Sequence, residues 1–326
     1  MSPLLLAAAL SAVPTGARDG AFSGGAKTYG ILVLAYDVDV QWRRELGSLR
    51  GQLKGHPVET VDDAEDAISV QRAVDRLVAQ RAAKIVVVPL ETVSESTRLG
   101  MTRFMFGARA GSARDVPDAD GGDPADKTPP PIRAIRRSAL VLPAGQRGRG
   151  LPGGGGSTLK RIQSPVPCVL APALDKSPAL VAILADRAAA LSSTRARETL
   201  VLAGIGPRSD AALKAWKASA QSTADQVGAK AGYRKAVAVA VRDGVRAGQQ
   251  DKDRADLKAT FRALIREGRV AVVPLSPEAG RVDELLKKNS GGFFGYRWNG
   301  RGIQGDRRLL DWIKASAEEA VNGGVK

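Results

Sequence analysis

The sequence is poor in the residues that most often carry metal and nucleophile chemistry. It contains one cysteine and one histidine in 326 residues. A single cysteine excludes an internal disulfide and a cysteine-built metal site, and a single histidine excludes a multi-histidine metal site. We expect Cys168 to be a small buried apolar residue, because free cysteines are usually buried. We expect His56, which precedes a predicted strand, to lie on the surface away from any site, and this excludes a catalytic triad.

Aromatic residues are also scarce, at 4% of the chain, whereas hydrophobic residues make up 44%. Ala, Val and Leu dominate the hydrophobic set, which suits closely packed layers of helix on sheet. The length allows two domains of ordinary size, each with its own core.

Acidic residues are outnumbered, with 34 Asp and Glu against 49 Lys and Arg, for a net charge of +15. Such an excess favours an anionic partner, although a merely soluble basic surface is an equal alternative. A nucleic-acid-binding protein needs a contiguous positive face. The basic residues here are dispersed and no nucleic-acid module is recognisable, so we expect no nucleic-acid partner.

Long hydrophobic runs are absent, and we expect no membrane span. Residues 4–13 form an apolar run of signal-peptide length that is too short to cross a bilayer. No Lys or Arg precedes this run. We interpret residues 1–27 as a signal-like, flexible N-terminus and predict an exported, periplasmic protein, with a cytoplasmic protein as the alternative.

Short apolar runs alternate with helical patterns along the first third of the chain. This alternation is typical of a parallel sheet with crossover helices. The predicted strands are 30–35, 57–61 and 84–90, and the predicted helices are 39–53 and 64–81.

The same order returns in the second half. The third strands match closely, Ile85-Val-Val-Val-Pro-Leu90 against Val270-Ala-Val-Val-Pro-Leu275. A repeat of more than a hundred residues indicates a duplicated domain. The predicted strands here are 198–203, 235–241 and 269–275, and the predicted helices are 210–229, 252–267 and 306–320.

We therefore predict the α/β class, with two duplicated flavodoxin-like domains, each a small parallel sheet flanked by helices. Residues 28–106 and 165–176 form the first domain, and residues 177–326 form the second. The first domain closes with a strand at 165–172, and a helix at 177–191 leads into the second. Residues 107–164 are a Gly-, Pro- and Arg-rich insert, which we expect to be loop or disorder. A duplicated domain is compatible with a monomer.

Ligands of open parallel sheets bind beyond the carboxyl ends of the strands. Tyr36 follows the first strand, and Gly204-Ile205-Gly206 follows its counterpart. Glu95 and Glu284 lie in the segments after the two third strands. Neither a complete dinucleotide fingerprint nor a Walker A sequence is present, so we expect no organic cofactor.

The duplicated strands, the segments Thr199–Pro207 and Ala171-Pro-Ala-Leu-Asp175, and Gly295-Tyr-Arg-Trp-Asn-Gly300 together carry a resemblance. The chain resembles the two-domain sirohydrochlorin cobaltochelatase/ferrochelatase family of class II tetrapyrrole chelatases, and its domains are chelatase-like. The resemblance implies insertion of a divalent metal substrate (cobalt, nickel or iron) into an anionic, polycarboxylated tetrapyrrole.

The family's histidines bind the metal and help remove the pyrrole protons, and every one of them is replaced here. Tyr36 stands at the first position and Glu95 at the second. The resemblance implies Glu95 and Tyr36 as catalytic residues, Ser94, Ser96, Gly204, Ile205 and Gly206 as tetrapyrrole-binding residues, and Glu95 and Glu284 as metal ligands.

These replacements weaken the expected chemistry. Neutral imidazole serves as both ligand and base near pH 7. The carboxylate of Glu95 is a credible substitute, whereas Tyr36, with an ordinary pKa near 10, is a poor ligand and has the alternative role of closing the core with its ring. Ile205 can do neither, and Glu95 and Glu284 have the alternative of being solvated loop residues. Two hypotheses remain, a chelatase of reduced activity and a non-catalytic relative that binds a tetrapyrrole or metal without metalation.

Overall fold

The computed structural model describes residues 28–36, 40–53, 55–107, 160–290 and 295–322. The predicted signal-like segment 1–27 lies outside these ranges, as does most of the predicted insert 107–164, so export stays a prediction. Among the described residues, none of the helices combines the length and the apolar character needed to cross a membrane.

The first half forms a four-stranded, fully parallel sheet in the order β2-β1-β3-β4. The central strands are buried because their residues are an unbroken apolar run, as expected for a sheet covered on both faces. The elements are β1 (Tyr29–Leu34), α1 (Val40–Gln52), β2 (Val58–Val61), α2 (Ala67–Ala79), β3 (Lys84–Pro89), α3 (Thr97–Met105) and β4 (Cys168–Leu170).

The second half repeats this arrangement with the sheet order β6-β5-β7-β8, again fully parallel. The predicted fold class, two duplicated α/β domains, is confirmed. The elements of this half are β5 (Thr199–Ile205), α5 (Asp210–Ala231), β6 (Lys235–Val241), α6 (Ala247–Glu267), β7 (Val270–Pro274), α7 (Gly280–Ser290), β8 (Tyr296–Trp298) and α8 (Arg307–Asn322). Helix α4 (Pro178–Ala189) follows β4 and is the last helix of the first half.

Short polar side chains fix where several helices begin. Asp66 accepts hydrogen bonds from the backbone N–H groups of the first turn of α2, and Ser96, Ser177 and Ser209 cap α3, α4 and α5 in the same way. Such caps satisfy donors that a helix start otherwise leaves unpaired. The residue before each helix is thereby held close to the end of the preceding strand.

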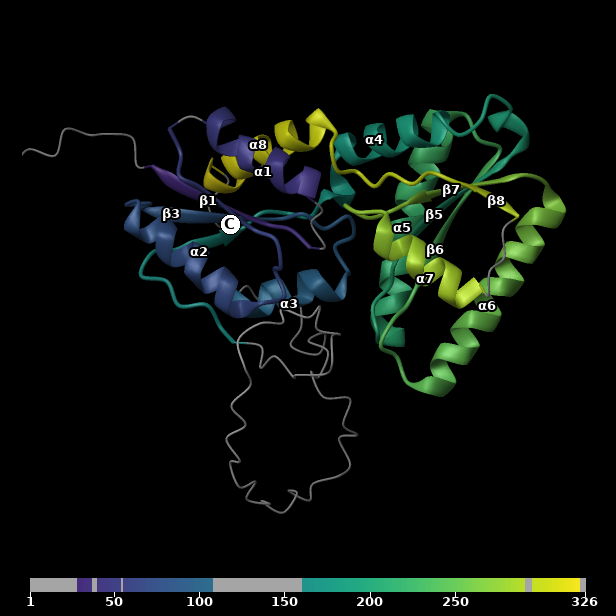
Figure 1. Cartoon of the computed structure of the whole chain (residues 1–326), viewed down its shortest axis with the longest axis horizontal. Coiled ribbons are helices and arrows are strands. Elements are labelled where there is room, and N and C mark those ends of the chain that lie inside the picture. The colour runs from purple at the N-terminus through teal and green to yellow at the C-terminus, as the bar shows by residue number, and fades with distance from the viewer. Residues whose placement is uncertain (1–27, 37–39, 54, 108–159, 291–294, 323–326) are drawn as a thin grey trace, which may run out of the picture.

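The last helix of each half packs on the other half's sheet. Helix α4 follows the first sheet in sequence but lies against β7 and α5, while α8 follows the second sheet and lies against β1, β3 and β4. In Figure 1, α8 lies beside α1 over the first sheet, although it is the last element of the chain. The Lys84 ammonium donates to the carbonyl of Val321 at 3.4 Å. The predicted boundary at residue 177 therefore leaves α4 on the side of the sheet on which it packs, whereas α8 packs across this boundary on the first sheet.

One apolar cluster consequently runs through both halves. It joins Ile31 and Val88 of the first sheet to Ile183 of α4, Leu202 of the second sheet and Ile313 of α8. The opposite faces have separate clusters, under α2 on the first sheet and under α6 and α7 on the second. Neither sheet buries its inner face with its own half alone.

Three elements were not predicted from the sequence: α3, α7 and β8. The predictions for His56 and Cys168 were correct in part. His56 lies at the amino ends of the strands as expected, but it is half-buried and stacks on Tyr29 with ring centroids 3.9 Å apart. Cys168 lies in β4 and is half-buried rather than buried.

The variant Ile313→Ala tests the exchange of helices. Ile313 is fully buried, and its truncation leaves a cavity, so we expect the free energy of unfolding to fall by about 2–5 kcal/mol. Hydrogen exchange should show the loss of protection in β1 and β3. The exposed neighbour Lys314 provides the control, since Lys314→Ala should change stability by less than about 0.5 kcal/mol. Loss of protection confined to β5 and β6 would contradict this packing.

Candidate functional site

The carboxyl ends of the two sheets meet, so the predicted site lies at a junction between halves. The hydroxyl of Thr92, just beyond β3, donates to the carbonyl of Leu275, just beyond β7, at 3.1 Å. Both residues are buried. The loops after the two third strands are thus in direct contact at this point.

Asp175 strengthens this junction from a third segment, the turn before α4. Its carboxylate accepts hydrogen bonds from the backbone N–H and the hydroxyl of Ser94, both at 2.8 Å, and from the hydroxyl of Ser219 in α5 at 3.0 Å. Ser94, predicted to bind a tetrapyrrole, is therefore engaged in holding the halves together.

Tyr36 lies inside the first half, with only 3% of its surface exposed. Its hydroxyl is 2.8 Å from the hydroxyl of Thr102 in α3, and the guanidinium of Arg98 lies 4.8 Å from its ring centroid. Burial, aided by the negative charge of Glu91, raises the pKa of the Tyr36 phenol far above its usual value. A phenol that keeps its proton is a poor metal ligand, and the geometry matches the alternative role in the core.

Glu95 and Ser96 stand at the start of α3. The hydroxyl of Ser96 accepts a hydrogen bond from the backbone N–H of Leu99 at 3.0 Å and so caps the helix. Glu95 is half-buried, and its Oε2 atom is buried with no hydrogen-bond partner among the described residues. A buried carboxylate oxygen without a hydrogen-bond partner lowers the stability of the folded protein. Binding of a proton or a cation to this oxygen would remove that cost. Of the two predicted catalytic residues, Glu95 is therefore the one with an atom still available for such chemistry.

The segment Gly204-Ile205-Gly206 is shaped by packing. A Cβ atom at Gly204 would lie 2.9 Å from the Trp216 ring, and one at Gly206 would lie 2.8 Å from the Cβ of Ala240. Both positions therefore exclude any larger residue without a shift of the neighbours. Ile205 is half-buried against the apolar cluster under α6 and α7.

Glu284, a predicted metal ligand, is exposed on α7 and pairs with Arg281 at 2.6 Å. Arg281 also pairs with Asp243, beyond β6. Within the described ranges, no group of three or more His, Cys, Asp or Glu side chains is placed to hold a metal ion. Glu95 and Glu284 thus do not form part of such a group.

A buried cation at the end of β6 escaped the sequence analysis. The Arg242 side chain is 2% exposed and binds Asp253 through two bonds, at 2.6 and 2.8 Å, and Asp210 at 2.7 Å. Burial opposes the charged form of Asp253, but hydrogen bonds from Arg242 and Gln249 outweigh it and hold the pKa of Asp253 below its usual value.

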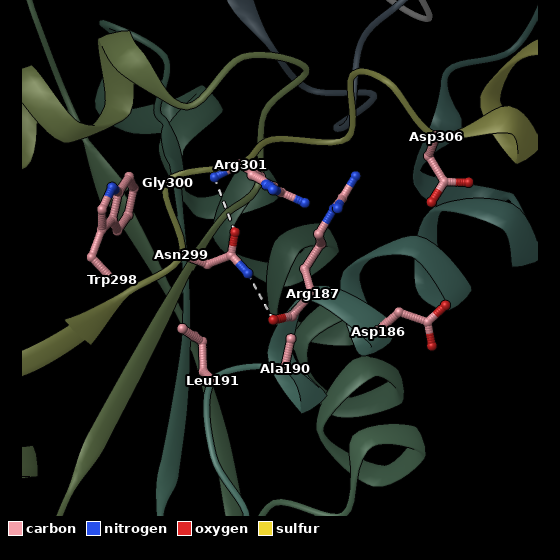
Figure 2. A pocket seen from close by; sticks show the side chains of 9 residues that line it. All are labelled: Asp186, Arg187, Ala190, Leu191, Trp298, Asn299, Gly300, Arg301 and Asp306. Carbon is pink, nitrogen blue, oxygen red and sulfur yellow. Dashed lines mark hydrogen bonds between the residues drawn. The ribbon is translucent and has the colours of Figure 1, made fainter.

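A pocket of about 460 Å³ lies at the edge strand of the second sheet, between the end of α4 and the segment that leaves β8. Figure 2 shows Trp298 on one side, Arg187 and Arg301 in the middle, and Asp186 and Asp306 on the other side. The sequence analysis noted residues 295–300 only as part of a resemblance. The alternation of aromatic, amide and cationic residues at 298–301 is the signal that could have marked a binding surface.

Comparisons with known proteins bear on the fold. No family model matches the sequence, and no curated protein matches it. The structure of SirB from Bacillus subtilis with Fe³⁺ overlays with a TM-score of 0.51 at 11% identity, covering 91% of this chain and 97% of SirB. The likeness shows a shared fold. At 11% identity it extends no further.

Two other solved structures overlay less closely. They are an ABC transporter solute-binding protein from Burkholderia multivorans, with a TM-score of 0.35 at 11% identity over 91% of each chain, and the myo-inositol-binding protein of Caulobacter, with a TM-score of 0.31 at 8% identity over 92% of each chain. At these TM-scores the overlap is too low to relate the chain to them.

The variant Asp175→Asn tests the junction between the halves. The amide keeps the shape but places a donor where the carboxylate accepts three bonds, so we expect stability to fall by about 1–3 kcal/mol. The double variant with Ser219→Ala should lose less free energy of unfolding than the sum of the losses in the two single variants, because both changes remove the same interaction. Asp311→Asn, which changes an exposed residue on α8, is the control. Stability is measured by chemical denaturation. An equal loss of stability in Asp175→Asn and Asp311→Asn would contradict the role of Asp175 at the junction.

The variant Asp253→Asn tests the buried cation through its pH dependence. A carboxyl whose pKa is lowered by folding stabilises the protein above its ordinary pKa, about 3.9, and loses that contribution as pH falls further. We expect the variant to be less stable by about 1–3 kcal/mol near pH 7, and the gap from the unmodified protein to close below about pH 4. Asp256→Asn, exposed on the same helix, should show no such pH-dependent gap in denaturation measured from pH 7 downward.

Proposed function

We propose that this chain is a chelatase-like protein that binds an anionic, polycarboxylated tetrapyrrole at the strand ends without inserting metal into it. The observation that supports this most is the placement of Tyr36. The position at which the resemblance expects a metal-binding histidine is filled by a buried side chain whose hydroxyl bonds to Thr102.

The fold supports the binding half of the proposal. The overlay on SirB, a protein solved with Fe³⁺, extends over nearly the whole of both chains. The net charge of +15 favours a polycarboxylate as ligand. Arg208, two residues beyond Gly206, is exposed and has no ion pair with any described residue, so its guanidinium is free to bind a propionate or acetate side chain.

The chemistry of the described side chains supports the absence of metalation. Insertion needs a ligand that captures the metal and a base that accepts two pyrrole protons. Tyr36 is buried and protonated at neutral pH, and Glu284 is paired with Arg281. Ile205 has no polar side-chain atom. Of the residues predicted to act as ligand or base, Glu95 is then the one left to perform both roles.

A second candidate function is slow metal insertion by Glu95, and one observation favours it. The Oε2 atom of Glu95 is buried without a hydrogen-bond partner in the described part of the chain. Such an oxygen can accept a pyrrole proton or bind a divalent metal substrate (cobalt, nickel or iron).

Titration of sirohydrochlorin into the protein, followed by Co²⁺, Ni²⁺ or Fe²⁺ without oxygen, separates the two candidates. We expect a saturable change in tetrapyrrole absorbance on binding, and then metalation at the rate of the protein-free solution. Arg208→Gln should weaken binding about fivefold to tenfold, because it removes one charge-assisted contact. Glu95→Gln should leave binding unchanged.

Metalation above background that disappears in Glu95→Gln, but persists in the exposed change Glu319→Gln, would replace the first candidate by the second. Absence of saturable binding would contradict both.

A further inference from the structure

The pocket beside β8 combines two free guanidinium groups with an apolar wall. It is built by the last turn of α4, residues 298–301 and Asp306 at the start of α8, and its volume of about 460 Å³ lies in the range of small-molecule sites. These walls come from segments more than a hundred residues apart in the sequence. The pocket shares none of the strand-end residues discussed above.

The backbone acceptors around the pocket are already occupied. The side-chain amide of Asn299 donates to the carbonyl of Arg187 at 2.7 Å, and its oxygen accepts from the backbone N–H of Arg301 at 3.0 Å. Arg297 donates to the carbonyl of Leu191 at 3.1 Å. The end of α4 therefore offers these arginines no free carbonyl at Arg187 or Leu191.

The two carboxylates of the pocket are occupied as well. Arg308 binds Asp306 through two bonds, at 2.7 and 2.8 Å, and Asp186 through one at 2.8 Å. Hydrogen bonds from Arg308, with help from the nearby charge of Arg187, lower the pKa of Asp306. A single guanidinium, that of Arg308, thus pairs with both aspartates on one side of the pocket.

Arg187 and Arg301 are left without an ion pair in the described part of the chain. The Nε atom of Arg187 is buried and has no hydrogen-bond partner there, and Arg301 is exposed. Figure 2 shows both guanidinium groups pointing into the same region, between Trp298 and Asp306. Three guanidinium groups against two carboxylates leave an excess of positive charge, and each planar guanidinium can donate to two oxygens of a carboxylate or phosphate at once.

The opposite wall suits a flat apolar group. Trp298 lines the pocket and is half-buried, because part of its side chain packs against the apolar cluster under α6 and α7, and the rest of its indole ring remains accessible. Ala190 and Leu191 line the pocket from the side of α4. An aromatic ring on Trp298 gains from stacking as well as from burial.

We propose that this pocket is a second ligand site, for a small molecule with a carboxylate or phosphate bound by Arg187 and Arg301 and a flat apolar part against Trp298. This site does not depend on the strand-end function, and it can be tested without any tetrapyrrole.

The test uses benzoate and phenyl phosphate as probes on the full chain, with neutral benzamide as the matched uncharged probe. Binding is measured by calorimetry and by ligand-detected NMR. We expect a Kd of about 1 mM for the preferred anion, since a single small anion makes few contacts. The better of the two anions identifies the carboxylate or the phosphate class.

Removing either cation should weaken anion binding about tenfold or more, in Arg301→Gln and in Arg187→Gln. Because Arg301 is exposed, its variant keeps the test valid if Arg187→Gln fails to fold. Arg307→Gln removes the same charge from an exposed position on α8 and should leave binding unchanged.

Three results would overturn the proposal. They are equal binding of benzamide and the anions, an equal loss of binding in Arg301→Gln and Arg307→Gln, and no binding of either anion at concentrations about tenfold above the expected Kd.

Discussion

The exchange of α4 and α8 between the two sheets is the constraint on which the rest of the structure depends. A parallel sheet must bury both faces, because its strands are apolar throughout. Here each sheet obtains part of its inner cover from the other half, so that one apolar cluster runs from Ile31 to Ile313. The halves are therefore layers of one folded unit, and the strand ends are brought into contact as a result.

This contact explains why the predicted site is so closely packed. Thr92 reaches across to Leu275, and Asp175 binds Ser94 and Ser219, so polar groups at the strand ends are used to join the halves. Hydrogen bonds of this kind stabilise the junction. Their acceptor atoms are already occupied, whereas a group that transfers protons needs a free acceptor atom. Among the described residues at the strand ends, the groups that keep an atom without a partner include Glu95, through its Oε2 atom, and the guanidinium of Arg208.

The strands and most helices could be predicted because their signals are local. Runs such as Ile85–Pro89 have no polar interruption, and the matching of the two halves made each prediction support the other. Helix α3 is short and carries Gly100, and β8 has three residues with no clear alternation, so neither gave a period that could be recognised. Because α3 was not predicted, the sequence offered a core role for Tyr36 as an alternative but not the contact with Thr102 of that helix.

The placement of α8 and the pocket of Arg187 and Arg301 depend on contacts between distant segments. Periodicity in the sequence identifies the apolar face of a helix such as α8. Which of the two similar sheets that face packs against depends on the contacts of the whole fold, which the local sequence does not contain.

The exchange of helices also has a meaning for symmetry. The last helix of each half packs on the sheet of the other half. Two copies of a chain in a domain-swapped dimer are related in the same way. A half-length protein with the same sheet could bury its apolar face only by pairing with a second copy. Joining two such copies in one chain makes that association permanent and lets the two halves diverge. The differences between the two sets of strand ends, with Tyr36 in one and Ile205 at the equivalent position in the other, are the asymmetry that such a fusion permits.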